Sequence, residues 1–257
     1  DKSAAGMVIL PTELLSDNGK KLQGILQQLA VYNKLESSFT EWLNTANLFC
    51  NTLVDCIVPG YPDITFRNAY EADHGYTDRL MIVTEVYRLW AIEGDAQLAA
   101  RIPFANLQNG IIIAPDIQKF KELKLRLLNG THTLSCGLAF LLGIPTVKEG
   151  MDSPDMSRFI RQTMLKEIAP AIPYPIPRQE ALEFAEQVLD RFRNPGIAHF
   201  WINITLQYSS KIRQRCVPVL QHYVQEFGHL PEYMTIGFAA FLVFSRAVKK
   251  EDHKYFG

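Results

Sequence analysis

The pattern of apolar residues changes near Asp116, and this change limits the folds that the chain can adopt. Before that point, apolar runs bounded by turn residues interrupt the helical periodicity, at residues 6–11, 54–58, 79–92 and 111–113. Short runs of this kind predict strands. After it, the spacing is helical and no good strand pattern follows. We therefore expect a mixed α/β domain over residues 1–115 and an all-α domain over residues 116–257.

Helical spacing of apolar residues predicts the remaining elements. The first domain has two such segments, 18–30 and 37–48. The second domain begins with a helical stretch over residues 116–142, and its later helices are expected at 178–192, 212–227 and 231–248. In each segment the apolar side chains fall on one face, which is typical of a helix that packs on a core.

Charge and cysteine usage narrow the class of protein. The 26 Lys and Arg residues nearly balance the 27 Asp and Glu residues. Nucleic-acid binders and membrane-surface binders carry a basic excess, so we expect neither kind of partner. The longest apolar run, Ile236–Phe244, is too short to span a bilayer, which needs about 20 residues. The four scattered cysteines indicate reduced thiols and a cytoplasmic protein, and no oligomeric state is predicted.

Several common catalytic motifs are missing from the sequence. No Gly-x-Gly occurs, so the glycine-rich turn that binds a dinucleotide is absent. The six histidines and four cysteines show no zinc-ligand spacing, and we expect no metal site. No Gly-x-Ser-x-Gly motif indicates a hydrolase.

Three polar residues in the helical stretch fall on one arc. With Lys124 at zero, an α-helix places Asn129 at about 140° and His132 at about 80° around the helix axis, because each residue turns the helix by about 100°. An ammonium, an amide and an imidazole that converge in this way can serve a carbonyl group: the amide holds the oxygen and the ammonium exchanges a proton with it. The alternative is a solvated helix face on which His132 is a structural histidine.

The motif Lys-x4-Asn-x2-His, at Lys124, Asn129 and His132, resembles the catalytic motif of the polyol-specific long-chain dehydrogenases, the mannitol dehydrogenase family. Three further segments are similar to that family in the same order along the chain: residues 11–19, 49–58 and 191–215. The resemblance implies the remainder of a Rossmann-like nucleotide-binding domain, followed by a helical substrate domain, with NAD as cofactor.

One branch of the family fits better than the others. Polyol enzymes usually carry an Arg eight residues before the lysine at Lys211, and this chain has Asn203 there. The pattern instead resembles the branch that interconverts D-tagaturonate and D-altronate, a sugar-acid substrate pair. Fructuronate reductases and mannitol 2-dehydrogenases are the neighbouring branches and remain alternatives.

The resemblance also implies roles for single residues near the reacting carbon. Lys124 would exchange the proton with the alkoxide. Asn129 and Asn18 would hold the carbonyl oxygen, and His132 would orient the sugar hydroxyls or Lys124.

Four other residues are candidates for the substrate and the cofactor. His199 and Lys211 are candidates for the carboxylate end of the substrate, because a carboxylate needs a cation or strong donors. Asp55 and Glu85 are candidates for the cofactor, although Glu85 is equally compatible with burial at the end of a strand.

Two departures from the family leave a rival interpretation open. Cys56 stands where the family has Arg. The glycine-rich half of the nucleotide-binding domain is expected upstream of Asp1, and the helical domain is expected to continue beyond Gly257. The rival is a non-catalytic relative that binds a sugar acid without turning it over. The intact Lys124, Asn129 and His132 oppose it.

Overall fold

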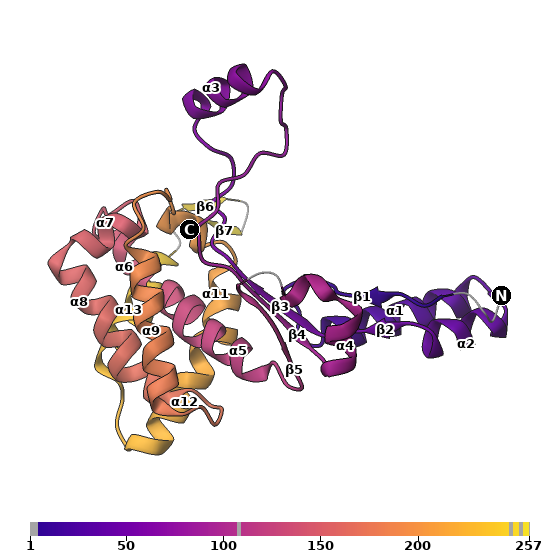
Figure 1. Cartoon of the computed structure of the whole chain (residues 1–257). Coiled ribbons are helices and arrows are strands. Elements are labelled where there is room, and N and C mark those ends of the chain that lie inside the picture. The colour runs from indigo at the N-terminus through magenta and orange to yellow at the C-terminus, as the bar shows by residue number, and fades with distance from the viewer. Residues whose placement is uncertain (1–4, 107–108, 247–248, 252–253, 257) are drawn as a thin grey trace. The chain divides into compact units, whose positions relative to one another are not determined.

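The computed structural model describes residues 5–106, 109–246, 249–251 and 254–256, which form two compact units (Figure 1). Unit 1 combines residues 1–56 with residues 86–121, and unit 2 combines residues 57–85 with residues 122–257. The chain thus passes between the units three times. Residues 57–85 pack with the helical unit, although they lie within the stretch that the sequence pattern assigns to the α/β domain.

Unit 1 is an α/β unit with two small sheets. Strands β1 (Val8–Ile9) and β2 (Leu48–Phe49) are parallel, and the chain between them forms helices α1 (Asn18–Tyr32) and α2 (Ser37–Thr45). The second sheet has the strand order β3–β4–β5, with β4 antiparallel to β3 and parallel to β5. Its strands are Thr52–Asp55, Leu89–Glu93 and Ile111–Ala114, and helices α4 (Ala96–Arg101) and α5 (Gln118–Leu123) flank β5 in sequence.

Alternation along β4 places a core on each face of this sheet. Ile92 packs with Cys50 and Leu98 on one face. Leu89 and Ala91 pack with Ile117 on the other face. Successive side chains of a strand point to opposite faces, so a strand buried on both faces is apolar throughout.

Three of the expected strands are shorter than the sequence suggests, and the one expected at residues 6–11 is reduced to β1. The prediction of a strand over residues 79–92 is wrong for most of its length, because β4 begins at Leu89. Leu80 and Val86 are exposed at 85% and 95%. Residues of this kind favour a strand only where their side chains pack against neighbours, and these two have none among the described residues. The expected strand at 54–58 ends at Asp55, because the N–H of Ile57 donates to the carboxylate of Glu85 instead of a neighbouring strand.

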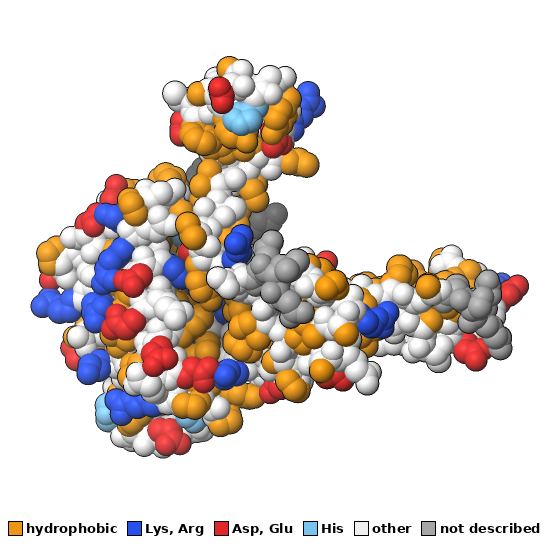
Figure 2. All heavy atoms as spheres, in the orientation of Figure 1, with side chains coloured by type: hydrophobic (Ala, Val, Ile, Leu, Met, Phe, Trp, Pro, Cys, Tyr) orange, Lys and Arg blue, Asp and Glu red, His pale blue; other side chains and the backbone are white. Residues whose placement is uncertain are grey.

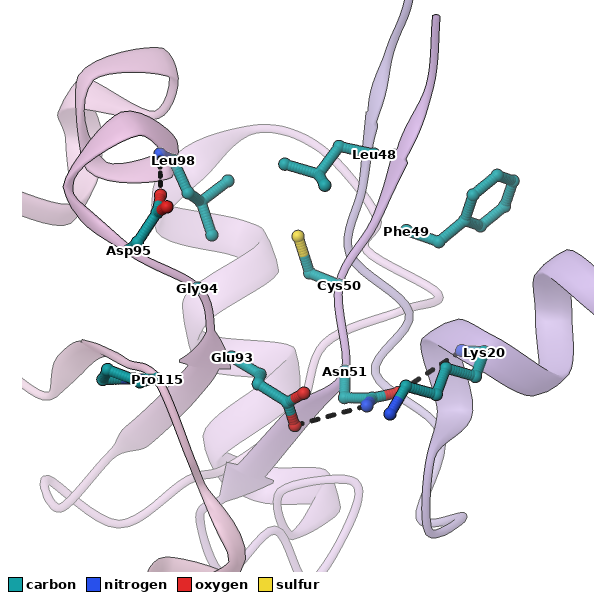
Figure 3. Close-up of a pocket in the computed structure, with 10 residues that line it drawn as sticks. All are labelled: Lys20, Leu48, Phe49, Cys50, Asn51, Glu93, Gly94, Asp95, Leu98 and Pro115. Atoms are coloured by element: carbon teal, nitrogen blue, oxygen red, sulfur yellow. Dashed lines mark hydrogen bonds between the residues drawn. The ribbon is translucent and has the colours of Figure 1, made fainter. Parts of the chain in front are cut away.

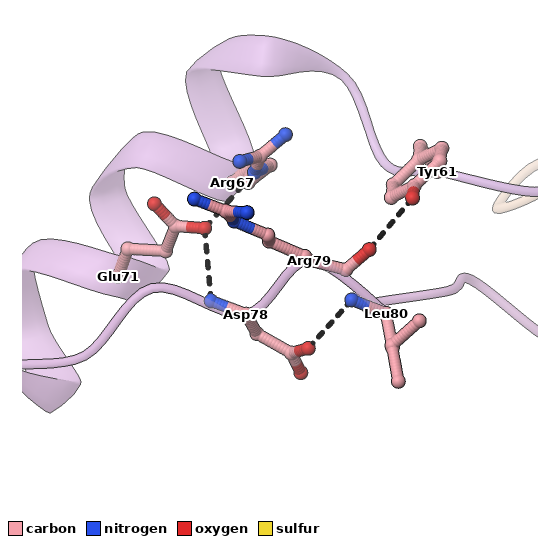
Figure 4. A network of polar contacts seen from close by, with 6 residues as sticks. All are labelled: Tyr61, Arg67, Glu71, Asp78, Arg79 and Leu80. Carbon is pink, nitrogen blue, oxygen red and sulfur yellow. Dashed lines mark hydrogen bonds and ion pairs between the residues drawn. The ribbon is translucent and has the colours of Figure 1, made fainter.

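Residues 57–85 form an excursion around helix α3 (Ile64–His74), which buries none of its side chains. A bridge between Gly60 and Val83 joins the two arms of the excursion, and the N–H of Glu85 also donates to the carbonyl of Ile57 at 3.1 Å. Polar contacts hold its tip, as Figure 4 shows: Arg67 pairs with Glu71, and Glu71 also accepts from the N–H of Asp78. The excursion therefore keeps its shape through hydrogen bonds more than through an apolar core.

Unit 2 is helical and is built around α6 (Thr131–Leu141), which is buried along most of its length. The other α-helices are α7 (Val147–Asp152), α8 (Pro154–Gln162), α9 (Arg178–Phe192), α10 (Trp201–Ile204), α11 (Tyr208–Lys211), α12 (Val217–Phe227) and α13 (Glu232–Phe244). A short hairpin, β6 (Lys249–Glu251) and β7 (Lys254–Phe256), follows α13, so the second half of the chain is not entirely helical. The structure thus confirms the predicted classes, an α/β unit and a helical unit.

Three segments of unit 2 are π-helices rather than α-helices. They are η2 (Lys124–Gly130), η3 (Thr163–Ile168) and η5 (Ile212–Cys216). Each continues directly into or out of an α-helix, so the predicted helical stretches are present with a different local geometry. A π-helix bonds each residue to the fifth residue along and is found often at functional sites.

The surface of unit 2 carries both signs of charge. Figure 2 shows blue and red side chains interspersed over the face that carries α8 and α9, where Arg161 pairs with Glu186 and Arg193 pairs with Asp190. Within the described part of the chain, no helix combines the length and the apolar character needed to cross a bilayer.

Gly237 tests the close packing of α13 against α6. A Cβ at this position would lie 2.9 Å from the carbonyl oxygen of Leu134, closer than packed Cβ atoms come to backbone. We expect Gly237→Ala to lower the free energy of unfolding by about 1–3 kcal/mol, because the backbones must move apart. In the matched control Gly24→Ala, nothing lies within 4 Å of the new Cβ, and helix propensity should raise stability by up to about 1 kcal/mol. Urea unfolding of both variants checks the pair, and a stabilised Gly237→Ala would contradict the packing.

Candidate active site

The helical run that carries Lys124 and Asn129 has π geometry. Both residues lie in η2, which leads directly into α6. The α-helical angles expected from the sequence therefore do not apply between them. In a π-helix the residues i and i+5 are one turn apart, so Lys124 and Asn129 are neighbours along the helix axis. The structure thus places both residues in one π-helical segment, and His132 follows in α6.

Lys124 is buried, with 9% of its surface exposed, and Asn129 is half-buried. The backbone carbonyl of Asn129 accepts a hydrogen bond of 2.7 Å from the hydroxyl of Thr133. This bond fixes the point where η2 passes into α6.

The ring of His132 is buried among other rings. It stacks on Phe192 with centroids 4.1 Å apart, and it meets His199 and Trp201 edge-on at 5.0 and 5.9 Å. Its Nε2 atom has no hydrogen-bond partner among the described residues. A buried polar atom without a partner costs free energy, so Nε2 is a candidate to bind a substrate hydroxyl.

The pKa of His132 is held well below its ordinary value of 6.5. Burial is the largest cause, and the neighbouring basic groups His199, Arg191, Arg215 and Lys211 act in the same direction. Burial also lowers the pKa of His199. Both rings are therefore neutral near pH 7, and each can donate and accept one hydrogen bond.

Arg126 joins η2 to η5. Its Nε donates to Glu122 at 2.8 Å, and its Nη1 donates to the backbone carbonyls of Gln214 and Arg215 at 2.7 and 3.1 Å. The two π-helices also approach closely at Gly130, where an added Cβ would lie 3.7 Å from the carbonyl oxygen of Arg215. Arg126 thereby holds the segment that carries Lys124 against the segment that carries Arg215.

Lys211 lies at the end of α11, and its ammonium donates to the carbonyl of Ile204 at 2.8 Å. Burial, followed by the charge of Arg215, lowers the pKa of Lys211. His199 lies on another segment and lines a narrow hollow of about 10 Å³ with Arg191 and Asn194. His132 contacts the ring of His199 directly. Lys211 acts on His132 through its charge, which helps to lower the pKa of His132.

Glu85 forms a buried ion pair with Arg191. The Nη2 and Nε atoms of Arg191 donate to its two carboxylate oxygens at 2.7 and 3.1 Å, and the N–H of Ile57 donates to Oε1 at 2.6 Å. The two ends of the excursion, Ile57 and Glu85, are thus pinned together at Arg191. Both oxygens of Glu85 are engaged here, so a cofactor contact of the kind that the resemblance implies would have to share them.

Asn18 and Asp55 lie in unit 1. Asn18 is buried, and its amide group donates to the carbonyls of Pro11, Glu13 and Thr52 at 3.0–3.1 Å, while its oxygen accepts from the N–H of Thr52. The amide therefore fixes the start of α1 against β3, and it must leave one of these acceptors to reach a substrate oxygen. Asp55 is 2% exposed at the carboxyl end of β3.

A hollow of about 410 Å³ opens at the carboxyl ends of β4 and β5 in unit 1 (Figure 3). Its lining includes Lys20, Asn51, Glu93 and Asp95. The amide of Asn51 donates to Glu93 at 3.3 Å, and its oxygen accepts from the backbone N–H of Lys20. Ligands of α/β sheets bind at this edge. Within the part of the chain that the structure describes, no group of three or more His, Cys, Asp or Glu residues could hold a metal ion.

Family models match both halves of the chain. The mannitol dehydrogenase Rossmann domain matches residues 1–106, and the mannitol dehydrogenase C-terminal domain matches residues 116–255. The chain belongs to the mannitol dehydrogenase family. Membership confirms the family that the sequence motifs indicate, and it identifies unit 2 as the major part of the family's C-terminal domain.

Several curated relatives that are similar to this mannitol dehydrogenase family member share one name. A protein named altronate oxidoreductase from Bacillus subtilis (strain 168) is 40% identical over 240 residues, which is 93% of this chain and 49% of that protein. A protein of the same name from Yersinia enterocolitica is 39% identical over 241 residues, or 94% of this chain and 49% of that protein. The chain spans about half the length of these relatives.

Solved structures of the family share the fold. The Pseudomonas fluorescens mannitol 2-dehydrogenase ternary complex with NAD and D-mannitol matches with a TM-score of 0.68 and 23% identity, over 95% of this chain and 48% of that one. A D-sorbitol dehydrogenase in substrate-free form matches with a TM-score of 0.75 and 19% identity, over 93% and 48%.

Sequence reasoning gave no role to three arginines that organise unit 2. Arg191 and Arg215 are part of the family-like segment 191–215, but their partners are far apart in sequence. Arg126 lies four residues after Glu122, a spacing that favours an ion pair on a helix. That spacing is the one signal that indicated a structural arginine here.

The buried pair between Glu85 and Arg191 should be sensitive to the loss of either partner. We expect Glu85→Gln or Arg191→Met to lower the free energy of unfolding by about 3–5 kcal/mol, because each leaves a buried charge without its partner. The double variant should lose less than the sum of the two. Glu186→Gln, in the exposed pair with Arg161, is the control and should cost at most about 1 kcal/mol. Urea unfolding measures all four, and additive losses would contradict a direct pair.

The lowered pKa of His132 predicts a pH-dependent stability. The unfolded chain protonates this ring near pH 6.5 and the folded chain does not. The free energy of unfolding should therefore be retained above pH 6.5 and should decrease below it, by up to about 1.4 kcal/mol per pH unit for one ring. His199 adds to this slope in the same direction. Unfolding between about pH 5 and pH 7.5 should show a shallower slope for His132→Asn. An unchanged slope, equal to that of the exposed control His229→Asn, would contradict the buried neutral state.

Proposed function

We propose that the whole protein is an NAD-dependent oxidoreductase that interconverts D-tagaturonate and D-altronate. The observation that carries this proposal is the 40% identity to a protein named altronate oxidoreductase over 93% of the chain. The intact set of Lys124, Asn129 and His132 supports catalysis over the rival function of binding alone. Three unpaired thiols, at Cys50, Cys136 and Cys216, support a cytoplasmic location.

Lys124 is the proposed general acid and base. During reduction its ammonium gives a proton to the oxygen of the former carbonyl, and during oxidation its amine removes that proton. Burial at 9% exposure keeps water away from this exchange. Asn129 is the proposed partner that binds the same oxygen through its amide N–H, and its position in the same π-helical segment as Lys124 supports this role.

His132 is the proposed orienting residue for the sugar hydroxyls. Its neutral ring is fixed by the stack on Phe192, and its unpartnered Nε2 offers one hydrogen-bonding position. His199 and Lys211 are the proposed contacts for the carboxylate end of the substrate. Asn18 supports the start of α1 in this structure, and its proposed contact with the carbonyl oxygen needs the amide to exchange acceptors.

The hollow of unit 1 fits the nicotinamide riboside end of NAD better than its phosphate groups. Asn51 and Glu93 suit a carboxamide and ribose hydroxyls, whereas the carboxylates of Glu93 and Asp95 disfavour phosphate groups. The pyrophosphate needs a glycine-rich turn, and the chain contains no Gly-x-Gly. When bound, NAD accepts or supplies the hydride, and the residues of the protein handle orientation and the proton. We propose that Asp55 in unit 1 and Glu85 in unit 2 act as buried positioning residues, each within its own unit.

Activity of the full-length protein tests the proposed function. Purified enzyme should reduce NAD with D-altronate and oxidise NADH with D-tagaturonate. D-mannitol and D-fructuronate serve as comparison substrates for the neighbouring branches. A higher kcat/KM for either of these than for the altronate–tagaturonate pair would replace the proposed substrate, and the absence of any turnover would favour the binding-only relative.

Loss of the Lys124 ammonium should stop turnover without unfolding the protein. We expect Lys124→Ala to reduce kcat of the full-length enzyme by about 10²- to 10⁴-fold, the range for loss of a general acid. Substrate affinity should change less than kcat, because the proton moves mainly in the transition state. Lys121→Ala, on the preceding turn, is the matched control and should keep its rate. A Lys124→Ala enzyme with more than about a tenth of the wild-type rate would assign the general acid to another residue.

A further inference from the structure

We propose that Arg215, together with Lys211, binds the carboxylate of the sugar-acid substrate, with Arg215 as the principal contact. This proposal rests on the proposed function and extends it, because it assigns the specificity for an acid to a residue that has no role in it so far. The two residues are called the cationic pair below.

The cationic pair has no carboxylate partner among the described residues. Lys211 bonds to a backbone carbonyl, that of Ile204, and the Nη1 of Arg215 donates to the hydroxyl of Thr133 at 3.2 Å. Both partners are neutral oxygens. Both cations are half-buried, so part of their hydration is lost without the return of a counter-charge.

Two other arginines of unit 2 are buried, and each has a carboxylate partner. Arg126 has Glu122 at 2.8 Å, and Arg191 has Glu85 at 2.7 Å, with both carboxylates largely buried. Buried charges in proteins are normally paired in this way. Arg215 is half-buried and donates only to the neutral oxygen of Thr133 among the described residues, so a ligand carboxylate would give it the kind of partner that Arg126 and Arg191 have.

The two cations of the pair lie close together on one helical run. Lys211 ends α11, and Arg215 follows four residues later in η5. Side chains at this spacing are neighbours on a helix, and like charges there repel each other. An anion between them removes the repulsion and gains from both charges.

Hydrogen bonds connect Arg215 with the candidate catalytic run. Its guanidinium donates to Thr133, and Thr133 donates to the carbonyl of Asn129. The backbone of η5 is fixed at the same point, because Arg126 binds the carbonyl of Arg215 itself. The guanidinium is therefore held two hydrogen bonds away from the residue proposed to bind the reacting oxygen.

The side chains of Arg215 and Lys211 suit a carboxylate better than the side chain of His199 does. A guanidinium presents a planar fork that matches the two oxygens of a carboxylate, and it stays charged at every physiological pH. Lys211 supplies a second charge. His199 is half-buried, and the loss of hydration lowers its pKa, so near pH 7 it offers no charge to an anion.

The experiment compares an acid with its neutral counterpart on the full-length enzyme. D-altronate and D-altritol differ in the carboxylate, which is a hydroxymethyl group in the polyol. Calorimetry gives the affinity for each, and steady-state kinetics give kcat and KM for altronate. Arg213→Met is the matched control, because Arg213 lies in the same π-helix and is exposed.

We expect Arg215→Met to weaken altronate binding by about 10- to 100-fold and to raise KM more than it lowers kcat, because a charge-assisted contact is lost. Altritol binding should be unchanged. Arg215→Lys should fall between, since it keeps the charge without the fork, and Lys211→Met should show a smaller loss for altronate than Arg215→Met. Arg213→Met should match the wild type for both ligands.

Three results would overturn the proposal. They are altronate affinity of Arg215→Met within about threefold of the wild type, an equal loss for altronate and altritol, and an equal loss in the Arg213→Met control. If Arg215→Met does not fold, Arg215→Lys and Lys211→Met carry the same comparison. Failure of the proposed function is distinguishable from failure of this proposal. If the proposed function is wrong, the wild-type enzyme does not turn over altronate. If only the role of Arg215 is wrong, the wild-type enzyme is active and the variants give one of the three results above.

Discussion

The guanidinium of Arg126 binds two backbone carbonyls of η5, and the arrangement of the candidate active site depends on that contact. Carbonyl groups in a buried helix need hydrogen bonds, and the change of helical register in η5 makes those of Gln214 and Arg215 available to a side chain. Glu122 neutralises the charge that would otherwise be buried. The result is a fixed crossing of η2 and η5, which carry Lys124 and Arg215 respectively.

Two buried ion pairs neutralise charge at two different places in unit 2. The pair of Glu85 and Arg191 closes the excursion around α3, and Arg191 precedes Phe192, whose ring supports His132. The pair of Glu122 and Arg126 fixes the helix crossing. The uncompensated cations lie where a charged ligand would bring its own counter-charge. In the proposed site, the substrate carboxylate would have for Arg215 the role that Glu85 and Glu122 have for Arg191 and Arg126.

Much of the fold follows from local patterns in the sequence, and the departures have physical causes. Apolar spacing predicts the strands near 54 and 111 and the helical segments that contain α1, α2, α5, α6, α9, α12 and α13, because these segments pack against a core, whereas α3, which buries no side chain, is not predicted. It fails over residues 79–88, where residues that favour strands meet no neighbouring strand. The motif of Lys124, Asn129 and His132 predicts the site, but π geometry is invisible to it. The partners of Glu85 and Arg191 are distant in sequence, so no spacing rule identifies the pair.

The π-helical turn at Lys124–Gly130 links the geometry of the site to the number of residues in a helix. A chain shorter by one residue here would return to ordinary α-helical bonding without breaking the helix. The twist per residue rises at the same time and offsets the missing residue, so the later side chains of α6 would keep nearly their present faces. The π geometry therefore accommodates one additional residue between Lys124 and Asn129, while the two stay one turn apart and His132 keeps its place against the ring of Phe192. In this family member, the local helix type absorbs a change in residue number that would otherwise shift a packed helix.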